Sequence, residues 1–231
     1  MVIVVESLEP EVQGFGAQMA RSSTLARLSL ETSRSHAWID EALFGPLEFP
    51  TSTAYRRFLC LFYGFQAPLE NALALTPGVD PRHFEGRGKA GRIAHDLMAL
   101  GLTRHEHLLL ARRQAVPAFE NAAQAVGWMY STERLMLQVE ALRVRLEVEM
   151  PVVMALAHQF LYVYVNTAEL RWRQFGAVLD RVAKNYDVEQ IVEAARTSLD
   201  ALHSWSLAPN TIKRSATNDE RITHPIARVS A

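Results

Sequence analysis

The chain has a single cysteine, Cys60, among 231 residues. One thiol cannot close an internal disulfide, which fits a reducing compartment. The N-terminus lacks a basic segment followed by a long apolar one, so we expect no secretory signal. The longest apolar run, residues 152–165, contains His158 and Gln159 and is too short to cross a membrane. These absences predict a cytoplasmic protein with no membrane partner.

Neither sign of charge dominates. Lys and Arg number 24 and Asp and Glu 25, so the formal net charge is −1 at pH 7. Basic runs of the kind that bind nucleic acid are missing, and we expect no such partner. Apolar residues make up 49% of the chain, which is enough for the core of one domain of ordinary size.

The predicted fold class is all-α, because no segment alternates polar and apolar residues between hairpin turns. We expect a flexible N-terminal arm over 1–22, one helical domain over 23–206 and a disordered C-terminal tail over 207–231, where the sequence becomes polar. The expected helices, each bounded by proline, glycine or capping residues, are 23–43, 51–75, 92–101, 104–114, 117–149, 152–183 and 188–205.

Local signals set several of these boundaries. Thr51 is available to cap the second helix, and Thr103 with Glu106 has the capping-box spacing. Gly101 suits the left-handed residue that follows a helix. Pro68 lies inside the second helical pattern and should kink or break that helix just before it.

A histidine lies on the apolar face of the first expected helix. Leu28, Thr32, His36 and Ile39 follow one another in steps of three or four, which puts them on one stripe. A core imidazole bonded to a carbonyl or hydroxyl is the ordinary explanation. The alternative is a metal ligand, since neutral imidazole binds iron and haem needs only one protein ligand. The pattern leaves both open.

Other catalytic patterns are missing. A di-iron carboxylate bundle requires Glu-x-x-His pairs, and the sequence has none. The spaced cysteines of a zinc site are absent, because the chain has only one cysteine. Neither a glycine-rich phosphate loop nor a Gly-x-Ser-x-Gly motif occurs. Cys60, among large apolar residues, is expected to be a buried structural thiol.

Several segments resemble the bacterial haem oxygenases. In their first helix, leucine, threonine, histidine and an acidic residue have the spacing of Leu28, Thr32, His36 and Asp40. Further segments resemble that family in the same order, namely 55–73, 86–102, 127–133, 171–180 and 188–205. The resemblance covers roughly residues 23–205, and the order of the segments is more specific than any one of them.

The resemblance implies an all-α fold that holds haem between a proximal and a distal helix, with His36 as the axial ligand of the iron. Haem is then both cofactor and substrate. With O2 and electrons from a ferredoxin or another reductase, haem oxygenases cleave it to biliverdin, carbon monoxide and ferrous iron. The resemblance also implies a partner that takes up the biliverdin, and a bacteriophytochrome is one such protein.

The expected distal helix departs from the family pattern. Arg134, Gln138 and Val139 stand where the family has glycines, which permit a kink and a close approach of backbone to haem. Arg134 and Gln138 lie on one face and are candidate donors to oxygen in a distal pocket. If Arg134 is buried there, it needs a carboxylate, a haem propionate or solvent as a partner.

The proximal segment departs as well. Ser29 stands where the family has a basic residue that pairs with a haem propionate. Arg27 and Arg34 flank this position and, with Thr32 and His36, are the cofactor-binding candidates. Both departures keep an alternative open, a non-catalytic protein on the same scaffold that binds haem, a bilin or a protein partner.

Overall fold

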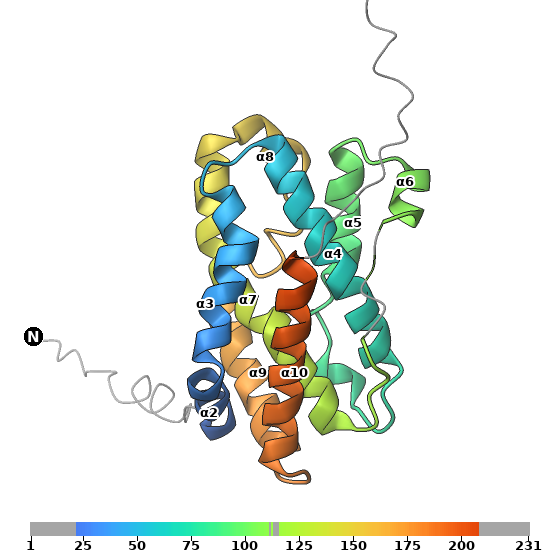
Figure 1. The fold of residues 1–231 in the computed structure, drawn as a ribbon, viewed down its shortest axis with the longest axis vertical. Coiled ribbons are helices and arrows are strands. Elements are labelled where there is room, and N and C mark those ends of the chain that lie inside the picture. The colour runs from blue at the N-terminus through green and yellow to red at the C-terminus, as the bar shows by residue number, and fades with distance from the viewer. Residues whose placement is uncertain (1–21, 111, 113–115, 208–231) are drawn as a thin grey trace, which may run out of the picture.

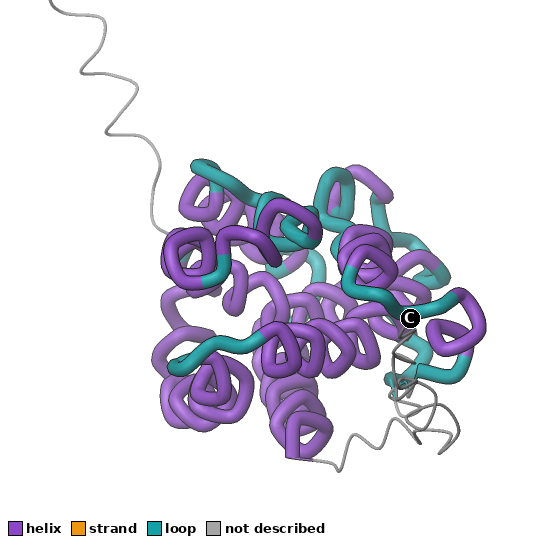
Figure 2. The backbone as a smooth tube through the Cα atoms, turned by 90° about the horizontal axis from the view of Figure 1, so that it is seen from above, coloured by secondary structure: helices purple, strands orange, loops and turns teal. Residues whose placement is uncertain are grey.

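The computed structural model describes residues 22–110, 112 and 116–207. Within these ranges the chain is helical and has no strand, which confirms the all-α prediction (Figures 1 and 2). No helix in the described ranges is long and apolar enough to span a membrane. The predicted arm and tail lie outside the described residues, except for Ser22 and Leu207 at their edges.

The α-helices of the described ranges are α2 (Ser23–Glu31), α3 (Ser33–Phe44), α4 (Ser52–Ala74), α5 (Ala90–Ala99), α6 (Arg104–Leu108), α7 (Ala122–Glu149), α8 (Pro151–Leu156), α9 (Ala168–Val182) and α10 (Val188–Leu207). Two short 3-10 helices, Gly45–Leu47 and Pro81–His83, lie in the connections.

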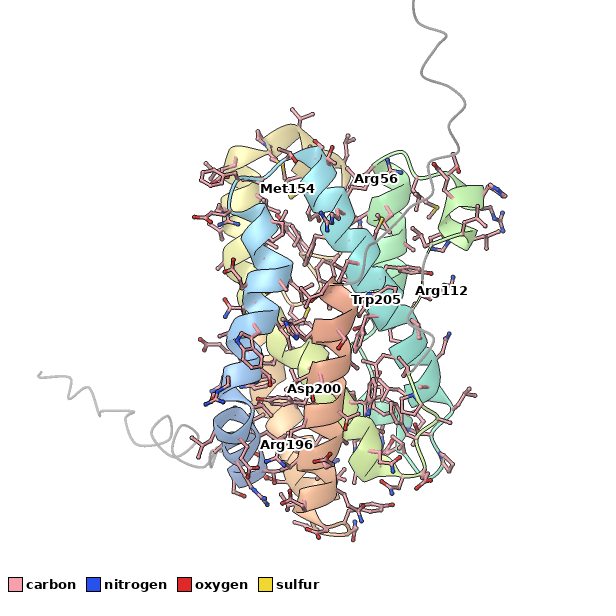
Figure 3. All side chains as sticks on the ribbon, viewed as in Figure 1. Arg56, Arg112, Met154, Arg196, Asp200 and Trp205 are labelled. Carbon is pink, nitrogen blue, oxygen red and sulfur yellow. The ribbon has the colours of Figure 1, made fainter. Side chains whose placement is uncertain are left out.

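The helix α7 forms the centre of the bundle. Its first half buries residues on all sides, as expected of a helix that others surround. Helix α10 packs along α7 and α3, α9 packs along α7, and α5 packs along α4 (Figure 1). Trp205, near the end of α10, anchors that helix to α4 by donating from Nε1 to the carbonyl of Leu61 at 2.8 Å (Figure 3).

The first predicted helix is wrong in one respect, because the structure divides it at Thr32 into α2 and α3. The backbone of Thr32 leaves the helical region, with φ −111° and ψ 7°. Its Oγ1 donates to the carbonyl of Leu28 at 2.6 Å, and such side-chain bonds to the backbone compete with a regular helix. The expected stripe survives the break, since Leu28, Thr32 and Ile39 are all buried.

The single helix predicted over 152–183 is also wrong. Helix α8 ends at Leu156, and α9 begins only at Ala168. Buried Asp96 of α5 accepts the backbone N–H groups of Gln159 at 2.9 Å and Phe160 at 2.8 Å. A carboxylate from a distant segment thus satisfies donors that a helix would otherwise have paired.

Of the kink or break predicted at Pro68, the break does not occur, because α4 runs through this residue. Phe65 and Leu69 on either side are fully buried. Tertiary packing of this apolar helix therefore outweighs the backbone hydrogen bond that proline removes.

The predicted caps are confirmed, although two helices are shorter than expected. Thr51 accepts the N–H of Ala54, and Thr103 forms its capping box. Helix α6 ends at Leu108 rather than near residue 114. Helix α7 begins after Asn121, whose side chain accepts the N–H of Gln124, rather than at Pro117. Gly101 has the expected positive φ of 84°.

Candidate functional site

His36 lies where α3 faces α7, and its imidazole is about half-buried. Its Nε2 atom is 2.8 Å from Oγ1 of Thr32 and 3.1 Å from the hydroxyl of Tyr130. The two hydroxyl oxygens are themselves 3.2 Å apart. Tyr130 comes from α7 and is fully buried, and Trp172 of α9 packs on its ring. Whichever atom donates, Nε2 is already engaged by groups of the protein.

Burial and the nearby positive charge of Arg134 lower the pKa of His36 to about 4, although Asp40 opposes this shift. The imidazole is therefore neutral at pH 7. A neutral imidazole between two hydroxyls needs no counter-ion, which explains how a titratable residue lies on a core-facing stripe.

Arg134 meets a carboxylate, one of the three partners that the sequence leaves open for this residue. Its guanidinium binds both oxygens of Asp40, with Nη2 and Oδ2 2.7 Å apart. The side chains are 15% and 27% exposed, respectively. Asp40 lies one helical turn after His36, so the ion pair and the imidazole share the contact between α3 and α7. We call the side chains of His36, Thr32, Tyr130, Arg134 and Asp40 the α3–α7 polar contact.

Haem does not fit beside His36 in this arrangement. A metal bound to imidazole would lie about 2 Å from the ring nitrogen, with the macrocycle extending around it. The Tyr130 hydroxyl is 3.1 Å from Nε2, and the pair of Arg134 with Asp40 crosses the same interface. Hydroxyl groups of the protein thus occupy the position at Nε2 that the resemblance assigns to the haem iron.

The structure brings together only part of the predicted site. Thr32, His36 and Arg134 meet in the α3–α7 polar contact. Arg27 instead pairs with Glu31 and Glu189, each at 2.5 Å, and so links α2 to α10. Arg34 and Gln138 are exposed.

A buried charged cluster is the feature that sequence reasoning missed. Glu133 of α7 is 3% exposed and accepts from Arg87, from Lys89 Nζ at 2.6 Å and from the Tyr164 hydroxyl at 3.0 Å. Lys89 is 1% exposed and also donates to the carbonyl of Arg87 at 2.9 Å. A glutamate inside the most apolar part of a long helix was the signal that could have revealed it.

The ionised forms of Glu133 and Lys89 are favoured in this cluster. Burial favours the neutral forms, but the mutual attraction of Glu133 with Lys89 and Arg87 is stronger. The pKa of Glu133 is therefore lowered and that of Lys89 raised. Both pKa shifts have the same cause, the buried ion pair between these side chains.

Cys60 is buried as predicted, and burial raises the pKa of its thiol to about 11. A thiol with this pKa is protonated at pH 7 and is a poor nucleophile. Among the described residues, no group of three or more His, Cys, Asp or Glu side chains is arranged to hold a metal ion.

No protein-family model matches this sequence, and no curated protein matches it either.

The lowered pKa of His36 has a consequence for stability. Between the ordinary value of 6.5 and the folded value of about 4, the unfolded chain binds the proton and the folded chain does not. The contribution of the neutral imidazole to the free energy of unfolding is therefore fully present above pH 6.5. It is lost as the pH falls from 6.5 towards 4. The free energy of unfolding of His36→Gln should therefore decrease less over this pH range than that of the wild type. Urea unfolding at a series of pH values measures the difference.

The matched control is His105→Gln, which makes the same change at an exposed position on α6. Its unfolding curves should follow those of the wild type at every pH. A constant difference between His36→Gln and wild type from pH 7 to pH 4 would contradict the buried neutral imidazole.

Proposed function

We propose that this chain is a non-catalytic protein on a haem-oxygenase-like scaffold, which works by binding a partner rather than by cleaving haem. The observation that carries the proposal is the distance of 3.1 Å between Nε2 of His36 and the Tyr130 hydroxyl. The ion pair of Arg134 with Asp40 supports it, because it crosses the same interface. This closed contact disfavours a planar tetrapyrrole, whether haem or a bilin, between α3 and α7.

Haem oxygenase is the second candidate, and the protonation state of His36 favours it. A neutral imidazole is the form that binds iron, and the lowered pKa keeps His36 neutral at pH 7. Access to Nε2 would require α7 to withdraw from α3 and Arg134 to release Asp40. The two candidates therefore differ in a measurable property, the affinity of the resting protein for haem.

Titration of the purified protein with haemin, followed by absorbance, separates them. We expect no sharp Soret band saturating at one equivalent for the wild type. Arg134→Gly removes the ion pair and leaves space beside His36, so it should raise haem affinity by tenfold or more, equivalent to about 1.4 kcal/mol. Adding His36→Ala to that variant should abolish the gain.

Arg143→Gly provides the control, since it introduces the same change on α7 but removes pairs with Glu140 and Glu147 instead. It should leave haem affinity unchanged. A wild-type Soret band at one equivalent that His36→Ala removes would overturn the proposal. It would make turnover with ascorbate or ferredoxin the next measurement.

A further inference from the structure

Helix α6 has one face that is both apolar and basic, and this face is open to solvent. The helix lies at the outer edge of the bundle, beyond α4 and α5 (Figure 1). Leu108 within it and Leu109 at its end are each 69% exposed, and Arg104 and His105 are exposed as well. At 100° per residue these four residues occupy an arc of about 140°, so they share one side of the helix. We call them the outer face of α6.

The opposite side of α6 holds the helix in place. The capping box of Thr103 with Glu106 fixes its first turn. The ring centroid of His107 lies 4.9 Å from that of Tyr63 on α4, and Leu110 is buried in the core. Because this side is packed, the helix cannot turn to bury its two exposed leucines. Their apolar surface is therefore a fixed feature of the fold.

Three arginines surround the outer face. Arg104 belongs to it, and Arg112, which follows the helix, donates from Nη2 to the Tyr63 hydroxyl at 3.3 Å (Figure 3). The pKa of Glu106 is lowered first by the hydrogen bonds of its capping box and, to a smaller extent, by the charge of Arg56, so Arg56 of α4 lies beside α6 as well. Among the described residues, none of the three arginines forms an ion pair with a carboxylate.

This combination indicates the chemistry of what would cover the face. Single exposed leucines are ordinary, whereas apolar side chains that lie together and are rimmed by charge are typical of protein-binding sites. Arginine is also enriched in such interfaces. Nucleic acid could pair with the arginines but would leave the leucines in water. Many helices that bind lipid surfaces are about 20–30 residues long, whereas α6 has 5. A protein segment with carboxylates and apolar side chains fits both properties of the face.

We propose that the outer face of α6 binds an acidic segment of a partner protein. Carboxylates of that segment pair with Arg56, Arg104 and Arg112, and its apolar side chains cover Leu108 and Leu109. The inference rests on the proposed function, because it names the surface and the chemistry through which the chain binds a partner. It uses no residue of the α3–α7 polar contact.

Fluorescence anisotropy with a labelled ten-residue peptide of glutamate and leucine tests this surface on the full chain. The peptide should bind with a dissociation constant below about 0.1 mM, and high salt should weaken the binding. A peptide with lysine in place of every glutamate should not bind. A peptide with serine in place of every leucine should bind at least tenfold more weakly. These comparisons use the wild-type protein and do not depend on the folding of any variant.

Two variants assign the binding to α6, and both change exposed side chains. Leu109→Ser should weaken peptide binding at least tenfold, because the apolar contact is lost. Arg104→Gln should weaken it about threefold, the effect of one exposed ion pair. Leu30→Ser and Arg173→Gln make the same changes at exposed positions of α2 and α9 and should bind as the wild type does. Circular dichroism checks the folding of all four.

Several outcomes would overturn the proposal. They are no saturable binding of the acidic peptide, equal binding of the lysine or serine peptide, and equal losses in the control variants. A dimer in sedimentation velocity that Leu109→Ser dissociates would mean that a second copy covers the face. Binding to phosphatidylserine vesicles that Arg104→Gln weakens would mean that a membrane does. A Soret band removed by His36→Ala would instead overturn the proposed function, and peptide binding would be unaffected.

Discussion

Replacing Glu133 by glutamine is expected to lower the free energy of unfolding by about 3–5 kcal/mol, the usual effect of removing one partner from a buried ion pair. The substitution keeps the shape of the side chain and removes its charge. Lys89, at 1% exposure, and Arg87, at 6%, would then be buried cations that have lost the carboxylate they share. Urea unfolding of the purified variant measures the loss.

Glu140→Gln is the matched control, because it makes the same change on α7 in a side chain that is 33% exposed and pairs with Arg143. Its cost should stay below about 1 kcal/mol, as for other partly exposed pairs. Adding Lys89→Met to Glu133→Gln should recover part of the loss, because it removes one of the unpaired cations. A loss below 1 kcal/mol for Glu133→Gln alone would show that water reaches this cluster.

The second large effect is expected at Gly127, where α7 packs closely against α10. A Cβ at this position would lie 2.6 Å from the carbonyl oxygen of Ile191 and 2.6 Å from Cβ of Ala194. Both obstacles are backbone or Cβ atoms of α10, so the helices themselves must move apart. Overpacking of this kind costs about 1–3 kcal/mol or more. Gly127→Ala should therefore destabilise the fold by up to about 2 kcal/mol after the gain in helix propensity of about 1 kcal/mol.

Gly91→Ala is the control for helix propensity alone. Gly91 lies in α5, and a Cβ there has no atom within 4 Å. This variant should be neutral or stabilised by up to about 1 kcal/mol. Thermal and urea unfolding compare the two. A stabilised Gly127→Ala would contradict the close contact between α7 and α10.

Local chemistry made part of the fold predictable. Thr51 and Thr103 cap helices because their hydroxyls satisfy N–H groups a few residues away, and that depends on nothing beyond the local segment. The stripe through Leu28 and Ile39 was predictable because a helix that buries one face repeats its apolar residues with the helical period.

The predictions of helix boundaries were wrong where contacts between residues distant in the sequence determine the local structure. The chain leaves the helix after Leu156 because Asp96 offers its carboxylate to Gln159 and Phe160, more than sixty positions later in the chain. Helix α4 continues through Pro68 because its neighbours are fully buried. Periodicity cannot reveal either cause, since both lie in contacts between segments.

By itself, the sequence determined the helical class, the caps, and the position of His36 on a core-facing stripe, because these follow from residue type and spacing. It also required a partner for Arg134. Only the tertiary structure decided that the partner is Asp40, that Tyr130 occupies the space beside His36, and that Glu133 is buried between Arg87 and Lys89. Each of these depends on which surfaces of distant helices meet, and that is fixed by the packing of the whole bundle rather than by any local segment.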